Sequence, residues 1–218
     1  MVLSPEQARR VYDRIGRAQD WQGFYEDAAT AELIAHSTFG DAGAVFELGC
    51  GTGRFAARLL ADHLPPAATY SGVDVSPRMV TLASERLAPW RGRAGVVLAD
   101  GTERVPVPDG GVARFVSNYV FDLLSPEATR AALDEAHRVL APGGLLCVAG
   151  LTPGERGIAR LVSRAWKRVW IRRPQLVGGC RPIRLTDALD PGRWEVRHRG
   201  VVVAWGIASE VVIATPRR

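Results

Sequence analysis

Cysteine is scarce in this sequence of 218 residues, and long hydrophobic runs are missing. The three cysteines, Cys50, Cys147 and Cys180, are too few and too far apart for a disulfide framework or a cysteine-rich zinc site. The longest apolar run, residues 201–208, is interrupted by a glycine and falls far short of the roughly 18 residues that a membrane span needs. The N-terminal residues mix charges early and lack the apolar stretch of a signal peptide. We therefore expect a cytoplasmic domain without a transmembrane segment.

Charge is unevenly distributed along the chain. Residues 1–150 hold 14 basic and 18 acidic side chains, whereas residues 151–218 hold 14 basic and 5 acidic ones. A basic tail of this kind suits phosphate, an anionic membrane surface or an acidic substrate. A solvated arginine face explains the same composition, and both interpretations stay open.

Segments with the patterns of strands and helices alternate between residues 44 and 150. The expected strands lie at 44–48, 69–73, 95–99, 113–120 and 145–149, and the expected helices at 55–63, 76–87 and 125–140. This alternation predicts an α/β fold with a parallel sheet and helices on both faces.

The two ends of the chain carry different patterns. Residues 4–40 have a helical pattern that begins with an N-cap serine and a proline at the first helical position. A long basic helix is expected at 155–171, followed by strands at 194–203 and 210–215 that form an antiparallel pair at the sheet edge. No linker divides the chain, so a single domain is predicted for residues 1–218.

The strongest motif is Glu47-Leu48-Gly49-Cys50-Gly51-Thr52-Gly53, which leaves a strand and enters a helix. Glycines at such a turn let a ligand approach the main chain closely, and the helix N-terminus supplies free N–H groups. Asp74 and Asp100 end the next two strands, so both carboxylates are expected at the same sheet edge. An acidic side chain about 20 residues beyond a glycine turn suits the hydroxyls of a ribose.

Together with the turn Leu140-Ala141-Pro142-Gly143-Gly144, these residues resemble the class I S-adenosylmethionine-dependent methyltransferases over about residues 44–150. The resemblance implies a Rossmann-like sheet of seven mostly parallel strands, a helical lid at residues 1–40 and a cofactor-binding core at 44–150. The basic helix and terminal strands at 151–218 complete the domain. The resemblance reaches, loosely, the ubiquinone/menaquinone and phospholipid methyltransferase group.

The resemblance implies specific contacts with S-adenosylmethionine. Glu47 and the backbone of residues 49–51 are expected to hold the methionine portion, beside which Asn118 lines the cavity. Asp74 is expected to accept the ribose hydroxyls, and Val75 to pack on the adenine. The complete set of expected cofactor contacts is Glu47, Gly49, Cys50, Gly51, Asp74, Val75, Asp100, Gly101 and Asn118.

Other interpretations of these residues stay open. A nicotinamide enzyme needs a glycine at the sixth position of its loop, where this chain has Arg54, and a phosphate-binding loop needs Gly-Lys-Ser/Thr, which is absent. Asp100, which precedes a glycine, also suits a simple turn. Cys50 is better explained as a small turn residue than as a nucleophile.

The catalytic residues cannot be identified from the motif. Candidates near the expected pocket are Tyr119, Asp122, Tyr25, His36 and Tyr12. Each has a structural alternative: Tyr25 as aromatic core, for example, or Asp122 as a helix cap. No metal site is predicted, because His63 and His137 have no acidic or cysteine partner at ligand spacing.

The acceptor is expected to be a small molecule or a lipid-like molecule. Enzymes of this family that methylate amino groups of nucleic-acid bases carry Asn/Asp-Pro-Pro-Tyr/Phe after the fourth strand, whereas this chain reads Ser117-Asn118-Tyr119-Val120. Nucleic acid is therefore disfavoured as a partner. A non-catalytic cofactor-binding protein and a nucleic-acid methyltransferase that uses the basic tail are the alternatives.

The basic helix suggests a second partner. Arginines recur every four residues from Arg156 to Arg172, opposite a face that holds Trp166 and Trp170. Basic helices with tryptophan on the apolar face are typical of membrane interfaces. We expect either peripheral contact of residues 156–173 with anionic lipid or packing of the apolar face on the sheet.

Overall fold

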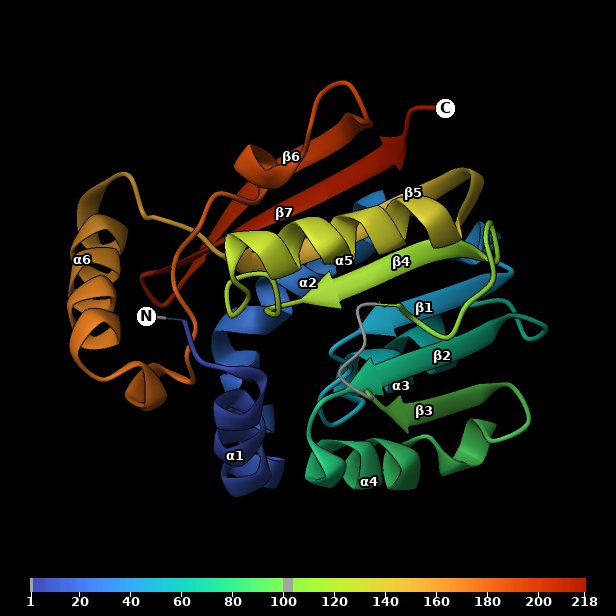
Figure 1. Cartoon of the computed structure of the whole chain (residues 1–218), viewed down its shortest axis with the longest axis horizontal. Helices are drawn as coiled ribbons and strands as arrows, with labels where there is room; N and C mark the ends of the chain where they lie inside the picture. The colour runs from blue at the N-terminus through green and yellow to red at the C-terminus, as the bar shows by residue number, and fades with distance from the viewer. Residues whose placement is uncertain (1, 100–103) are drawn as a thin grey trace.

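The computed structural model describes residues 2–99 and 104–218, which form one α/β domain (Figure 1). The strands are β1 Ala44–Leu48, β2 Thr69–Asp74, β3 Ala94–Leu98, β4 Val112–Asn118, β5 Leu140–Leu151, β6 Trp194–Ala204 and β7 Ile207–Pro216. The α-helices are α1 Pro5–Ile15, α2 Gly23–His36, α3 Arg54–Asp62, α4 Pro77–Arg86, α5 Pro126–Val139 and α6 Gly157–Arg172. Short 3-10 helices are η1 Gly16–Gln22, η2 Phe39–Asp41, η3 Ala88–Trp90, η4 Pro174–Val177 and η5 Leu185–Ala188.

The seven strands form one sheet in the order β3-β2-β1-β4-β5-β7-β6. Strands β1 to β5 pair in parallel, whereas β7 is antiparallel to both β5 and β6. This arrangement confirms the predicted fold class and the antiparallel C-terminal pair. Because the order reverses between β1 and β4, the loops that follow these strands diverge and leave a crevice at the carboxyl edge of the sheet.

Alternate residues of each central strand face two separate cores. Val45, Val116 and Cys147 pack with α2 and α3 on one face, whereas Phe46 and Phe115 pack with α5 and η5 on the other. The period of two along a strand therefore places helices on both faces, as the sequence predicted. In Figure 1, α5 lies in front of the sheet and α2 behind it.

Helix starts follow the serine–proline pairs of the sequence. Ser4, Ser76 and Ser125 are N-caps, each accepting a hydrogen bond from the backbone of the third residue after it, and a proline follows each of them. A proline at the first position costs no hydrogen bond, because the N–H that it lacks has no partner within a helix.

Two strand boundaries differ from the prediction. Strand β5 begins at Leu140, five residues earlier than expected, and the Pro-Gly-Gly segment forms an irregularity within it, where the register with β4 shifts. Strand β4 ends at Asn118 rather than residue 120, because Tyr119 adopts a left-handed backbone conformation with φ of 56°. Residue 119 therefore turns the chain away from the sheet at the crevice.

Helix α6 lies beyond the carboxyl edge of the sheet, on the left in Figure 1, where it contacts η4 and β7. Only Ala159 is buried within it. Within residues 2–99 and 104–218, the structure holds no helix with the length and apolar character of a membrane span.

Glu210 fixes the β6–β7 pair to the rest of the domain. Its side chain is fully buried on β7 and accepts hydrogen bonds from Arg199 Nε on β6 (2.6 Å), from Thr186 Oγ1 (3.2 Å) and from the Leu185 backbone N–H. Glu210 thus joins η5 to two strands through charge-assisted bonds.

We expect Glu210→Ala to lower the free energy of unfolding by about 1.5–3 kcal/mol, the range for hydrogen bonds to a charged group. The measurement is urea unfolding followed by circular dichroism. Glu195→Ala is the matched control, because Glu195 forms a surface pair with Arg197 (3.1 Å) and should change stability by less than about 0.5 kcal/mol. Equal effects of the two variants would contradict this role of Glu210.

Candidate functional site

The loop at residues 49–53 leaves β1 and leads into α3 at the carboxyl edge of the sheet. Gly49, Gly51 and Gly53 have φ of 75°, 53° and 72°, in the left-handed region that favours glycine. A Cβ on Gly49 would lie 2.3 Å from Val120 Cγ2, so only glycine fits there. The loop shape therefore requires the glycine pattern that the sequence carries.

The N–H groups of this loop are bonded to the end of β2. Gly49 and Cys50 both donate to the Val73 carbonyl (2.9 and 3.0 Å), and Gly51 donates to Asp74 Oδ2 (2.9 Å). The N–H groups of residues 49–51 are thus bonded within the protein, and the expected contacts of these residues with the methionine portion stay predictions. These N–H groups hold the loop in shape. The glycines, which have no side chains, let a ligand come close to the main chain.

Asp74 lies mostly buried at the end of β2. One carboxylate oxygen accepts the Gly51 N–H, and the other accepts the Ser76 N–H (2.9 Å). Burial raises the pKa of this carboxyl above its usual value, against the lowering effect of these bonds. A carboxylate has about four acceptor positions, so Asp74 retains capacity for ribose hydroxyls, and the neighbouring Val75 is exposed, as adenine packing requires.

Glu47 is fully buried on β1 and faces the same crevice. Tyr70 Oη donates to its Oε2 (2.6 Å), and Asn118 Nδ2 donates to its Oε1 (3.4 Å). Burial raises the pKa of Glu47 to about 7. A carboxyl that ionises near neutrality in this position suits a ligand that brings its own positive charge.

A cleft of about 130 Å³ is lined by Glu47, Asn118 and the glycine loop, whereas Asp74 and Val75 lie outside its lining. The N-terminal segment forms one wall, and the glycine loop, Glu47, Asn118 and Tyr119 form the other. This volume is smaller than the roughly 300 Å³ or more of typical ligand pockets. An adenosyl ligand would therefore be only partly enclosed, and its remainder would lie toward the open surface at Val75.

Two buried amide oxygens in the cleft have no hydrogen-bond partner within the described residues: Gln19 Oε1 and Asn118 Oδ1. Buried polar atoms of this kind normally find a partner. These two amide oxygens and the Glu47 carboxyl are hydrogen-bond acceptors, and together they fit the ammonium group of a methionine moiety. The chemistry of the cleft is therefore consistent with the cofactor implied by the sequence.

Three tyrosines and a cysteine line the far end of the cleft: Tyr12, Tyr25, Tyr119 and Cys180. Tyr25 meets Tyr119 edge to face, with ring centroids 5.6 Å apart, and Tyr119 Oη bonds Ser209 Oγ (2.9 Å). Burial raises the pKa of all three phenols, so they remain protonated near neutral pH. Tyr25 and Tyr119 therefore lie in the cleft as predicted, as packing and donor groups rather than bases.

Two other predicted candidates do not line the cleft. Asp122 is fully buried behind it, where Oδ2 accepts the Leu151 N–H (3.3 Å) and Oδ1 has no partner within the part of the chain described. Burial raises the pKa of Asp122 to about 7. His36 lies at the far end of α2, stacked on His198 of β6. Asp100 and Gly101 lie outside the described residues, so their contacts stay predictions.

Glu26 lines the cleft and was not predicted. It lies in the first turn of α2, beside Arg54 Nη2 at 3.4 Å, and burial raises its pKa to about 7. The sequence signal was weak, because an acidic residue in the first turn of a helix is commonplace. Only the contact between the start of α2 and Arg54 at the start of α3 reveals its position.

Asp122 should make stability depend on pH. Its carboxyl stays protonated in the folded protein up to about pH 7 but ionises near pH 4 in the unfolded chain, so its contribution to stability falls as pH rises through this window. We expect Asp122→Asn to gain stability relative to the native chain between pH 4 and pH 8, measured by urea unfolding across that range. Asp62→Asn, at an exposed site, should show no such trend. A pH-independent difference for Asp122→Asn would contradict the raised pKa.

Comparisons with known proteins agree with this geometry. Residues 45–144 match the family model described as "Methyltransferase domain". The chain is 36% identical over 124 residues to a carboxy-S-adenosyl-L-methionine synthase of Chromohalobacter salexigens, covering 55% of this chain and 45% of that protein. It is 29% identical to a malonyl-[acyl-carrier protein] O-methyltransferase of Marinomonas sp., covering 76% of this chain and 61% of that protein.

A third relative is a tRNA N(3)-methylcytidine methyltransferase of Drosophila melanogaster, 30% identical over 56% of this chain and 39% of that protein. The chain thus spans between 39% and 61% of the length of these curated relatives. Among solved structures, the [4+2]-cyclase SpnF superposes with a TM-score of 0.73 at 17% identity, over 98% of this chain and 97% of that one. This likeness shows the fold alone.

Proposed function

Because the chain belongs to the class I S-adenosylmethionine-dependent methyltransferases, we propose that it transfers a methyl group from S-adenosylmethionine to a small-molecule or lipid-like acceptor. The observation that carries this proposal is the position of Glu47 and Asn118 in one cleft beside the glycine loop, whose Gly51 N–H is bonded to Asp74. The fold by itself is insufficient, because a cyclase shares it.

The cofactor, when bound, supplies an activated methyl group on a sulfonium. The chain's part is to bind and orient. Ionised Glu47 attracts the cationic methionine portion, while Asn118 Oδ1 and Gln19 Oε1 accept hydrogen bonds from its ammonium. Asp74 fixes the ribose. Holding both reactants at attack distance in a cleft that excludes water is the main source of rate enhancement in this reaction class.

We propose Glu26 as the group that takes a proton from an oxygen, sulfur or carbon acceptor. It lines the cleft beside Tyr25, and its pKa of about 7 matches the requirement for a base at neutral pH. Arg54, 3.4 Å away, stabilises the ionised form. The rings of Tyr25 and Tyr119, packed edge to face in the cleft, orient the acceptor by contact with its apolar surface.

The walls of the cleft support a small acceptor with an aromatic or apolar body. The end that adjoins Glu26 is built from Tyr12, Tyr25, Tyr119 and Cys180, which offer apolar surface with a few polar tips. RNA is nevertheless the competing acceptor, because one relative is named for its action on tRNA.

The cofactor proposal predicts a pH-dependent affinity. Calorimetric titration with S-adenosylmethionine and S-adenosylhomocysteine should show binding of both, and the affinity should rise between pH 6 and pH 8 as Glu47 ionises around pH 7. Glu47→Gln should bind at least about tenfold more weakly at pH 8, a loss of about 1.4 kcal/mol, and should lose this pH dependence. Glu127→Gln, at an exposed site on α5, is the control. No heat with either ligand from folded native protein would overturn the proposal.

The class of methyl acceptor can be identified with S-adenosylmethionine that carries a labelled methyl group. Incubation with a cell extract divided into small-molecule, lipid and RNA fractions should place the label in the first or second fraction. Label in RNA would contradict the proposed acceptor.

The role of Glu26 as the base is tested separately. Glu26→Gln should slow the transfer to an oxygen or sulfur acceptor by about 10²-fold or more.

We further propose that α6 contacts an anionic membrane. Of the two interpretations that the sequence left open, the tryptophans fit packing on the body, because Trp166 and Trp170 turn inward and donate to the carbonyls of Cys180 (2.8 Å) and Gly179 (2.9 Å). These bonds hold the helix on the segment before β6. The helix is therefore anchored to the body by one face, while its opposite face lies toward solvent.

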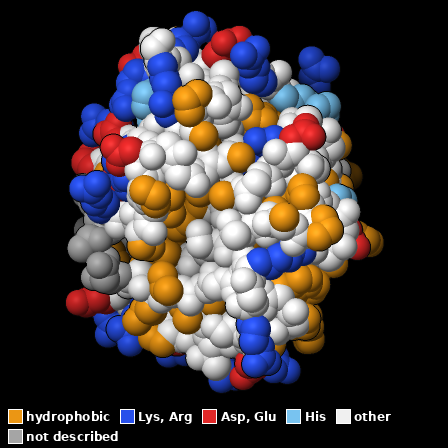
Figure 2. All heavy atoms as spheres, turned by 90° about the vertical axis from the view of Figure 1, so that its right-hand side faces the viewer, with side chains coloured by type: hydrophobic (Ala, Val, Ile, Leu, Met, Phe, Trp, Pro, Cys, Tyr) orange, Lys and Arg blue, Asp and Glu red, His pale blue; other side chains and the backbone are white. Residues whose placement is uncertain are grey.

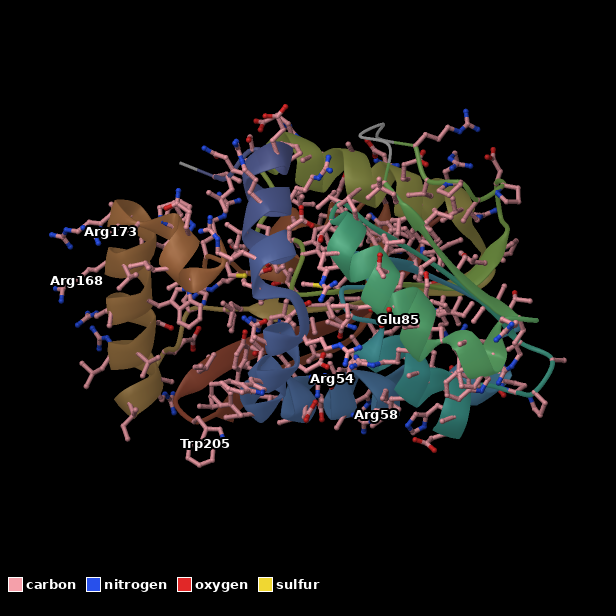
Figure 3. The ribbon with its side chains drawn as sticks, turned by 90° about the horizontal axis from the view of Figure 1, so that it is seen from below. Arg54, Arg58, Glu85, Arg168, Arg173 and Trp205 are labelled. Carbon is pink, nitrogen blue, oxygen red and sulfur yellow. The ribbon has the colours of Figure 1, made fainter. Side chains whose placement is uncertain are left out.

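The outward face carries an apolar stripe beside a row of cations. Ile158 and Leu161 are 72% and 64% exposed, and Ala165 and Val169 continue the stripe at helical spacing. The flanking cations are Arg160, Arg164, Lys167, Arg168 and Arg172. In Figure 3, Arg168 points away from the body at the outer end of the molecule.

The β6–β7 turn extends this surface. Trp205 is 81% exposed at the turn, and a Cβ on the adjacent Gly206 would lie 3.0 Å from Ile158 Cγ2, so the turn abuts the start of α6. On the opposite side of the molecule, basic and acidic side chains are interspersed around the rim (Figure 2). An apolar stripe with an exposed tryptophan and one-sided positive charge complements anionic lipid.

Co-sedimentation with phosphatidylglycerol vesicles at low salt should pellet the native protein, and neutral phosphatidylcholine vesicles should not. Leu161→Glu and Trp205→Ser should each reduce pelleting severalfold, because they remove apolar contacts that reach the acyl boundary. Val196→Glu, at an exposed apolar position on β6 away from α6, is the control. No pelleting with the anionic vesicles would sink the membrane proposal.

A further inference from the structure

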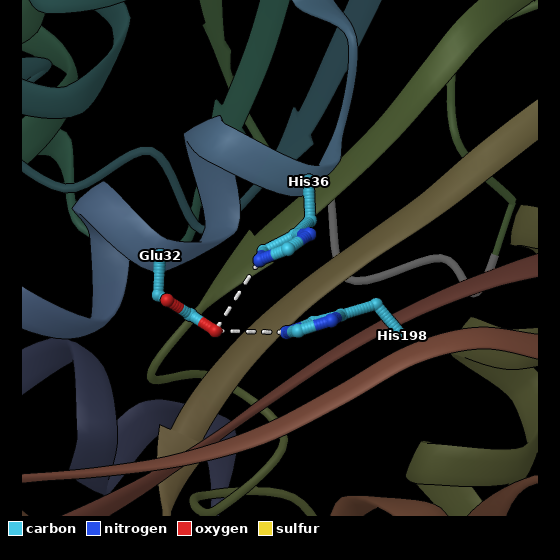
Figure 4. Close-up of side chains that lie close together, drawn as sticks. All are labelled: Glu32, His36 and His198. Atoms are coloured by element: carbon cyan, nitrogen blue, oxygen red, sulfur yellow. Dashed lines mark hydrogen bonds and ion pairs between the residues drawn. The ribbon is translucent and has the colours of Figure 1, made fainter.

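Glu32, His36 and His198 form a cluster at the junction of α2 and β6, apart from the cleft (Figure 4). Glu32 Oε1 lies 3.5 Å from His36 Nε2 and 3.0 Å from His198 Nε2. The two imidazole rings stack at 3.6 Å between centroids, 10° from parallel. One atom from each side chain lies within 4.8 Å of the other two.

The local fold brings all three side chains together, and because the stacked imidazole planes do not meet, an ion bound by both rings requires one ring to turn out of the stack. Glu32 and His36 are four residues apart on α2, so they lie one above the other on one helix face. Their partner comes from a strand whose register with β7 shifts between Val196 and His198. A bulge of this kind changes the direction of a side chain, and bulges are frequent beside functional sites.

Gly200 provides the space. It lies two residues beyond His198, on the same face of β6, and a Cβ there would lie 3.0 Å from Glu32 Oε1 and 3.1 Å from His198 Nε2. Glycine inside a strand weakens it and often marks a place where another group approaches closely. Here the approaching groups are two of the three members of the cluster.

We propose that Glu32, His36 and His198 bind a divalent zinc ion. Two imidazole nitrogens and one carboxylate oxygen form a common three-residue zinc ligand set, with metal–ligand distances near 2.0–2.2 Å. Ligand atoms in such a tetrahedral site lie about 3.3 Å apart, and the two separations from Glu32 Oε1, 3.0 and 3.5 Å, lie close to that value. This proposal departs from the prediction from the sequence, which had no metal site.

All three side chains are partly exposed, between 22% and 44%. The ion can therefore enter from solvent, and a water completes its coordination. Zinc favours imidazole nitrogen, and an oxygen-seeking ion such as Mg²⁺ would not select two histidines. The proposal is independent of methyl transfer, since none of these residues lines the cleft.

The bound ion would cross-link α2 to the edge strand. Helix α2 supplies Tyr25 and Glu26 to the cleft from its first two turns, while Glu32 and His36 lie in its last two turns. Zinc thus clamps the end of α2 that is farther from the cleft onto β6. This is a structural role, and the expected effect is on the stability of the folded state.

The test uses full-length protein without a polyhistidine tag, freed of metal by chelation. Calorimetric titration with zinc sulfate should show one ion per chain, and zinc should raise the melting temperature. Co²⁺ in place of zinc should give visible absorption bands of a nitrogen- and oxygen-ligated ion. If the native chain does not bind zinc, the proposal is overturned.

Three variants and one control locate the ion. Glu32→Gln, His36→Gln and His198→Gln should each weaken zinc binding at least tenfold and abolish the zinc-dependent rise in melting temperature. His36 is 44% exposed, so its variant should fold even where the His198 variant does not. His63→Gln removes an imidazole from outside the cluster and should bind as the native chain does. Undiminished binding by folded His36→Gln would also overturn the proposal.

Discussion

The cleft depends on the hydrogen bonds between the glycine loop and the end of β2. The Val73 carbonyl and the Asp74 carboxylate accept the N–H groups of Gly49, Cys50 and Gly51, so two neighbouring strand ends are joined into one rigid edge. This join fixes where Asp74 lies relative to Glu47. It also means that the loop recognises a ligand mainly through its shape and the side chains around it, because its donors are already used.

Burial of acidic groups is the second constraint on this edge of the sheet. Glu26, Glu47 and Asp122 all have pKa values raised to about 7 by burial. Because these three carboxyls ionise at a higher pH in the folded protein than in the unfolded chain, the free energy of unfolding falls as pH rises toward 7. Such a cost is typical of sites that bind charged ligands or move protons, where function and stability conflict.

The sequence predicted the sheet, the helices and the position of the cleft, because those depend on local patterns. Alternating strands such as β1 and serine–proline starts such as Ser76-Pro77 are encoded within a few residues. The sequence failed where the outcome depends on contacts between distant segments. Glu26 reaches the cleft only because the start of α2 lies beside Arg54 of α3, and Trp166 turns inward because the Cys180 carbonyl accepts its indole N–H.

Helix α2 shows why such contacts matter for function. Its first turn provides a wall of the cleft, and its last turns meet β6 through Glu32 and His36. The middle of the helix, with Ala29 and Leu33, is buried in the core on the sheet. The edge strands β6 and β7 both contact α2, and Ser209 of β7 also bonds Tyr119 of the cleft (2.9 Å), so the wall that carries Tyr25 and Glu26 rests on the antiparallel edge of the sheet although neither strand lines the cleft.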